Sequence, residues 1–134
     1  MIINARTRVR VARPSRDLAA AERFYVDGLG LDVLWRSTER VPGHHDLLMV
    51  GPPDGNWHFE LTRDPERPLE PVPTVDDLFV VYLGVPVEEE QVERLVAAGG
   101  TRVAAHNPYW DEHGVTVADP DGYRLVLCSR TWGG

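Results

Sequence analysis

The sequence contains a single cysteine, Cys128. One cysteine excludes a disulfide framework and a cysteine-based zinc site within one chain, which agrees with a reducing compartment. The chain also lacks any apolar run near the roughly 20 residues that a bilayer-spanning helix needs. Its first residues contain no apolar stretch typical of a secretion signal. We therefore expect a cytoplasmic protein with no membrane partner.

Positive charge is scarce. The chain has 14 Lys and Arg residues against 21 Asp and Glu residues, and its formal net charge is −7. Such a surface repels phosphate backbones, so we expect no nucleic-acid partner and a mild preference for cationic ligands. The sequence also lacks a glycine-rich phosphate loop, a G-x-S-x-G motif and a Cys–His pair, so it has no evident carrier of nucleophilic catalysis.

The chain divides near its middle. Residues 63–75 contain four prolines, which lack the amide donor that a central strand needs, so this segment is predicted to be a linker. On each side of the linker, at about 5–62 and 76–130, the pattern predicts one strand, one helix and three further strands. The two helices are expected over residues 17–26 and 86–98.

Two βαβββ modules predict an α+β fold. We expect one domain, residues 1–134, in which eight strands form a cupped mixed sheet with the helices on its outer face. The concave face is the expected place for a small-molecule ligand. Alternation along the strands places Val9 and Val11 under the first helix. The same alternation predicts that polar side chains point into the cup: Arg8, Arg10, His58, Glu60 and Arg124.

Two segments resemble a known family. Residues 13–34, RPSRDLAAAERFYVDGLGLDVL, have Asp-Leu at the start of a helix, Phe-Tyr late in it and a Leu-Gly-Leu turn. Residues 114–127, GVTVADPDGYRLVL, resemble the end of a second module. Together they resemble the vicinal oxygen chelate superfamily, which includes glyoxalase I, bleomycin-resistance proteins and extradiol dioxygenases. The resemblance spans nearly the whole chain and implies the paired-module fold.

The resemblance also implies where a metal would bind. Metal enzymes of the superfamily hold one divalent ion with inward His and Glu side chains from the first and last strands of both modules. In this sequence those positions fall on Arg10, Glu60, Leu78 and Val126. Because Glu60 alone keeps a ligand type, we expect no metal cofactor. A divalent metal in a nonstandard site is the alternative.

Arg10 and Glu60 are predicted to pair across neighbouring strands. A guanidinium–carboxylate pair would occupy the place of the metal. Arg10 then anchors an anionic or carbonyl group of a ligand, or the pair only closes the floor of the cup. His58, with Glu60, is the best general acid/base candidate because imidazole titrates near neutral pH. A polar lining role for His58 is the alternative.

Aromatic residues form a second group of candidates. Tyr109 and Trp110 lie in the connection before the seventh predicted strand, a region whose aromatic residues often line the ligand cup in this family. Their rings would stack on a planar or sugar-like ligand, or else they form a plug over the core. Tyr82 is a weaker candidate of the same kind.

Two functions remain open from the sequence. The first is a metal-independent small-molecule-binding protein, similar to the drug-sequestering members of the superfamily, which are homodimers with ligand grooves at the subunit interface. The second is an enzyme of the glyoxalase or dioxygenase type, with His58 and Glu60 as acid and base or with a nonstandard metal. The missing metal ligands favour the first function.

Overall fold

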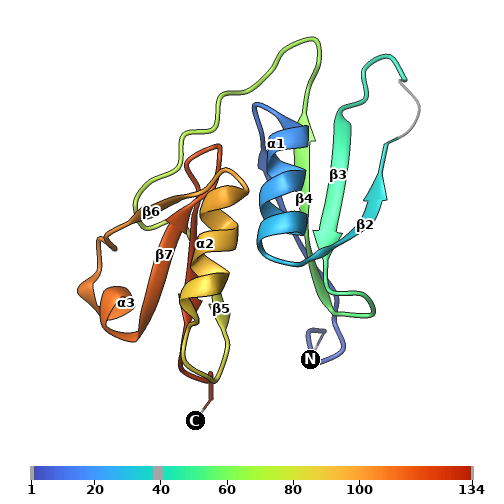
Figure 1. Cartoon of the computed structure of the whole chain (residues 1–134). Coiled ribbons are helices and arrows are strands. Elements are labelled where there is room, and N and C mark those ends of the chain that lie inside the picture. The colour runs from blue at the N-terminus through green and yellow to red at the C-terminus, as the bar shows by residue number, and fades with distance from the viewer. Residues whose placement is uncertain (1, 38–40, 134) are drawn as a thin grey trace.

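The computed structural model describes residues 2–37 and 41–133 (Figure 1). The chain runs through the same order of elements twice, with an irregular segment after β4 joining the halves. The first module contains β1 (Val9–Pro14), α1 (Leu18–Glu22), η1 (Arg23–Gly28), β2 (Asp32–Arg36), β3 (Asp46–Gly51) and β4 (Trp57–Arg63). The second contains β5 (Leu78–Tyr82), α2 (Glu89–Ala97), β6 (Thr101–Val103), α3 (Pro108–His113), β7 (Gly114–Ala118) and β8 (Arg124–Cys128).

Each module forms one mixed four-stranded sheet. The strand order is β1-β4-β3-β2 in the first sheet and β5-β8-β7-β6 in the second. In both sheets the first strand runs parallel to the last, and the other neighbouring pairs are antiparallel. The predicted α+β class with two βαβββ modules is therefore confirmed.

The main helices begin where the sequence provides a cap. The Asp17 carboxylate accepts hydrogen bonds from the amides of Ala19 and Ala20 at 3.0 and 3.1 Å, so α1 starts directly after it. The helix then continues as the π-helical η1. At the start of α2, Gln91 Oε1 accepts a hydrogen bond from the Glu88 amide at 2.9 Å and forms a capping box.

Both modules share one hydrophobic core, and the helices lie inside it, between the two sheets (Figure 1). The ring of Tyr25 in η1 lies 5.9 Å from that of Phe59 in the first sheet. Its neighbour Phe24 packs against Val117 in the second sheet. The two sheets also meet directly, because the rings of Phe59 and Phe79 stand edge to face at 4.3 Å.

Each sheet therefore turns its other face outward, away from the shared core. This differs from the expected single cup, in which both helices cover the outside of one eight-stranded sheet. The helices pack against each other because Gly28 has no side chain; a Cβ there would lie 3.0 Å from the Ala98 Cβ. Val9 and Val11, expected under the first helix, are 51% and 44% exposed. β1 is an edge strand, and α1 packs over β3 and β4 instead.

A buried polar network also joins the modules. The Tyr25 hydroxyl donates to Asp119 Oδ2 at 2.7 Å, and the Ser15 hydroxyl donates to Asp121 Oδ2 at 2.6 Å. All four side chains are buried. Burial raises the pKa of both Tyr25 and Asp119, because the low-dielectric surroundings disfavour their charged forms. The network ties the start of the first helix to the turn between β7 and β8.

A third helix, α3, lies where the strand and helix pattern of the sequence predicts only a connection. Asn107 Oδ1 accepts a hydrogen bond from the Tyr109 amide at 3.1 Å, and Pro108 fills the first helical position. Asn followed by Pro is a helix-start signal, so the sequence did contain the information for this helix. None of the helices in the described part of the chain has the length and apolar character to cross a membrane.

Candidate functional site

The outward face of the first sheet carries a cluster of Arg10, His58 and Glu60. Arg10 lies opposite His58 in the parallel pairing of β1 and β4, so their side chains share one face of the sheet. Arg10 Nη1 lies 2.8 Å from Glu60 Oε2, and Arg10 Nε donates to His58 Nε2 at 3.0 Å. A weaker contact joins Arg10 Nη2 to the Met49 sulfur at 3.8 Å. The predicted Arg10–Glu60 pair is present.

Arg10 occupies one ring nitrogen of His58. A guanidinium only donates hydrogen bonds, so His58 Nε2 is the acceptor of this bond. Glu60 is well covered, with its side chain 13% exposed, whereas the Arg10 side chain is 50% exposed. Both acid/base candidates thus contact the same solvent-accessible guanidinium.

The cluster does not fit a divalent metal. The Arg10 guanidinium, which cannot ligate a cation, lies against the one carboxylate that matches a ligand position of the superfamily. Leu78 and Val126 lie in the other sheet, and the Val126 side chain is fully buried. Across the described residues, no group of three His, Cys, Asp or Glu side chains converges as a metal site would require.

A hollow of about 550 Å³ adjoins the cluster and shares Glu60 with it. Its other walls come from β2, β3 and the segment before β3. Trp35 offers a half-exposed ring, and His45 Nε2 lies 3.6 Å from Asp64 Oδ2 at its edge. The lining residues are Trp35, Ser37, Val41, His44, His45, Leu47 and Glu60. His44 and His45 are not among the predicted site residues, although two adjacent histidines after Gly43 are a visible signal in the sequence.

The aromatic candidates lie on the outward face of the second sheet. The Tyr82 and Trp110 rings are 6.5 Å apart, and Tyr109 lies 5.0 Å from Trp110 and 4.6 Å from His113. A second hollow, of about 520 Å³, is lined in part by Tyr82, Tyr109 and Trp132. Aromatic side chains therefore gather at one end of this face.

The rest of that face is covered by the chain itself. The segment containing α3 lies over β7 and β8, and Thr116, Val126 and Cys128 beneath it are fully buried. Arg124 Nη1 donates to the Ala104 carbonyl at 3.1 Å and so holds this segment in place. The segment covers this part of the sheet, while Tyr82 and Tyr109 remain 38% and 39% exposed.

The two groups of candidates do not meet within one chain. Arg10, His58 and Glu60 lie on the outward face of the first sheet, and Tyr82 and Trp110 lie on the outward face of the second. The shared core separates these faces. A single pocket that contains both groups therefore requires a second copy of the chain.

Comparison with known proteins identifies relatives for both modules. A family model described as the YycE-like N-terminal domain matches residues 9–62, and one described as the YycE-like C-terminal domain matches residues 76–129. The uncharacterized protein YycE of Bacillus subtilis is 36% identical over 120 residues, which cover 89% of this chain and 85% of YycE. Its crystal structure superposes with a TM-score of 0.82, at 34% identity, over 96% of this chain and 95% of that one.

More distant structures share the fold alone. TnmS3, an antibiotic-binding protein from Streptomyces sp. CB03234, is 21% identical with a TM-score of 0.62 over 98% of this chain and 99% of its own. The fosfomycin resistance protein FosX from Mesorhizobium loti is 13% identical with a TM-score of 0.65 over 98% and 95%.

Proposed function

The chain belongs to the YycE-like family of the vicinal oxygen chelate superfamily, and from this premise we propose that it is a metal-independent small-molecule-binding protein. Its ligand binds on the outward face of the first sheet, in the hollow beside Arg10 and Glu60. The observation that carries the proposal is the position of the Arg10 guanidinium, which lies between His58 and Glu60 where metal enzymes of the superfamily place a cation.

Arg10 supplies the anchoring chemistry. A guanidinium has five N–H groups, and the contacts to His58, Glu60 and Met49 leave others for a ligand. Glu60 holds the Arg10 guanidinium in place, so a carboxylate, phosphonate or carbonyl oxygen of the ligand meets a pre-oriented donor. The apolar part of the ligand then packs on Trp35 and Leu47.

The complete site is proposed to form in a homodimer. The aromatic end of one chain's second sheet, with Tyr82, Tyr109 and Trp110, would close over Arg10 of the other chain. Two observations support this arrangement: the faces point apart within one chain, and Val9 and Val11 are exposed at the free edge of β1. A self-complementary pairing of this kind buries the same apolar edge on both subunits. We propose a cytoplasmic location for the dimer.

A metal-free enzyme is the alternative function. His58 and Glu60 lie together beside the hollow and would serve as its acid and base. Arg10, however, binds both His58 Nε2 and Glu60 Oε2, which are the atoms a general base would need. The geometry therefore supports binding better than proton transfer.

Titration calorimetry with phenylphosphonate, a flat molecule with one anionic group, tests the proposal. We expect saturable binding to the wild type and at least about tenfold weaker binding to Arg10→Ala. Arg102→Ala removes an equal charge from a pair on the second module and serves as the control. Unchanged affinity in Arg10→Ala contradicts the anchoring role. Stoichiometric zinc, nickel, manganese or iron in the purified protein contradicts the metal-independent function.

A further inference from the structure

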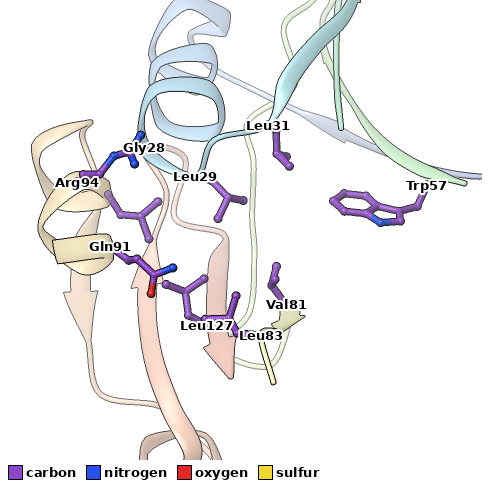
Figure 2. Close-up of a pocket in the computed structure, with 10 residues that line it drawn as sticks. Gly28, Leu29, Leu31, Trp57, Val81, Leu83, Gln91, Arg94 and Leu127 are labelled. Carbon is purple, nitrogen blue, oxygen red and sulfur yellow. The ribbon is translucent and has the colours of Figure 1, made fainter. Parts of the chain in front are cut away.

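A separate pocket of about 190 Å³ lies at the seam between the two modules, and it is partly open to solvent (Figure 2). Its walls come from the core side of both sheets and not from their outward faces. Helices η1 and α2 contribute further residues. The lining residues are Gly28, Leu29, Leu31, Trp57, Val81, Leu83, Gln91, Arg94, Leu95 and Leu127.

The cavity walls are almost entirely apolar. Five leucines and Val81 face it, and Trp57 reaches in from β4 on the opposite side (Figure 2). Ordered water makes two to four hydrogen bonds, and most of these walls offer no polar partner, so water in the pocket is readily displaced by an apolar ligand. An enclosed cavity of about 150 Å³ with similar aliphatic and aromatic walls binds benzene, and the pocket here has a comparable volume. The space here therefore suits an organic molecule of roughly six to nine heavy atoms.

One polar side chain, Gln91, determines which ligands the cavity favours. Gln91 Oε1 is committed to the Glu88 amide at 2.9 Å, which fixes the side-chain amide and leaves its Nε2 atom as the free end. Within the described residues, Nε2 has no hydrogen-bond partner, and Figure 2 shows it on the cavity side of the side chain. An N–H donor in an apolar pocket favours a ligand with one acceptor oxygen.

Arg94 in α2 lies at the rim of the cavity. Its Nη2 donates to the Asp27 carbonyl at 3.3 Å, so the guanidinium is held against the end of η1. The positive charge lies beside Gly28 at the rim. A neutral ligand avoids the cost of burying an ion in the apolar interior, which an anion would incur if it entered fully.

We infer that this seam cavity is a second ligand site, for a small neutral aromatic molecule with one acceptor oxygen, such as an aryl ketone. The ring packs among the leucines and Trp57, and the carbonyl oxygen accepts from Gln91 Nε2. This site is independent of the proposed function, since it shares no residue with the Arg10 cluster. Because it bridges both modules, its occupant stabilises their packing.

The probes are acetophenone and toluene, which differ by one carbonyl group. We expect acetophenone to bind with one site per chain, to raise the melting temperature and to shift the Trp57 indole N–H resonance. Gln91→Glu keeps the oxygen that caps Glu88 but removes the N–H donor. The Gln91→Glu variant should bind acetophenone at least about tenfold more weakly than the wild type, and its affinity for toluene should be nearly unchanged.

Filling the space is the second arm of the test. Val81→Phe should abolish binding of both probes, whereas Val85→Phe, the same change at an exposed position, should leave it intact. The Arg10→Ala variant should also bind acetophenone with the affinity of the wild type. The inference is overturned if neither probe binds at millimolar concentration, if Gln91→Glu and folded Val81→Phe both bind acetophenone like the wild type, or if the shifted resonances belong to Tyr82 and Trp110 alone.

Discussion

The hydroxyl of Tyr25 in the first module donates a 2.7 Å hydrogen bond to Asp119 in the second, with both side chains buried. Asp119 also accepts two backbone bonds through Oδ1, from the amides of Asp121 and Tyr123 at 2.8 and 2.9 Å. One side chain thus organises the turn between β7 and β8 and fastens it to η1. Interactions of this kind hold the two sheets in the arrangement that separates their outward faces.

Removing the Tyr25 hydroxyl should destabilise the fold. Tyr25→Phe keeps the ring but leaves a buried carboxylate oxygen without its donor, and we expect a loss of about 1–3 kcal/mol in the free energy of unfolding. Urea denaturation monitored by circular dichroism measures it. Tyr109→Phe removes a hydroxyl from a partly exposed tyrosine and should change stability little. Equal effects of the two substitutions would show that the Tyr25–Asp119 bond contributes nothing specific.

The free energy of unfolding should depend on pH through the protonation of Asp119. Burial raises the pKa of Asp119 in the folded state. Its protonated form is therefore favoured by folding, and this contribution is present below about pH 4 and is lost as the pH rises through the folded-state pKa. In Asp119→Asn the contribution is absent. We expect the wild type to gain stability relative to Asp119→Asn as the pH is lowered through that window.

Asp77 provides a control of opposite sign. Hydrogen bonding by the Thr74 backbone lowers the pKa of Asp77, so folding favours its charged form. The wild type should lose stability relative to Asp77→Asn as the pH falls through the folded-state pKa. Unfolding midpoints of the wild type and both variants between about pH 3 and 7 compare the two trends. Parallel curves for Asp119→Asn and the wild type would contradict the Asp119 prediction.

Part of this architecture could be predicted from the sequence and part could not. Arg10 and Glu60 could be paired because the first and last strands of a βαβββ module are neighbours and alternation puts both side chains on one face. The placement of the helices between the sheets depends on Gly28 meeting Ala98 from the other module, a nonlocal contact without a local signal. Arg124 was assigned to the cup, and its bond to a backbone carbonyl depends on the course of a connection that the strand pattern leaves open.

The close packing between the modules predicts a strong effect at Gly100. A Cβ at this position would lie 2.7 Å from both Phe24 Cε1 and Val117 Cγ1, closer than carbon atoms can approach. We expect Gly100→Ala to reduce the free energy of unfolding by about 1–3 kcal/mol. Phe24→Leu removes part of the obstacle, so the double variant should be more stable than the sum of the single effects. Strict additivity in a double-mutant cycle would mean that Phe24 does not limit space at Gly100.

The proposed dimer makes the sharpest prediction for the binding site. If Arg10 of one chain and Trp110 of its partner line the same pocket, then Arg10→Ala and Trp110→Ala homodimers both bind phenylphosphonate poorly. Unfolding and refolding the two variants together produces mixed dimers, and each mixed dimer contains one pocket with both residues intact. Random pairing should then restore about one binding site per four chains, with the wild-type dissociation constant. A pocket built within one chain predicts no recovery, because every chain in the mixture lacks one of the two residues. Titration calorimetry distinguishes the two outcomes by stoichiometry, and the same variants refolded separately and then combined without exchange give the baseline.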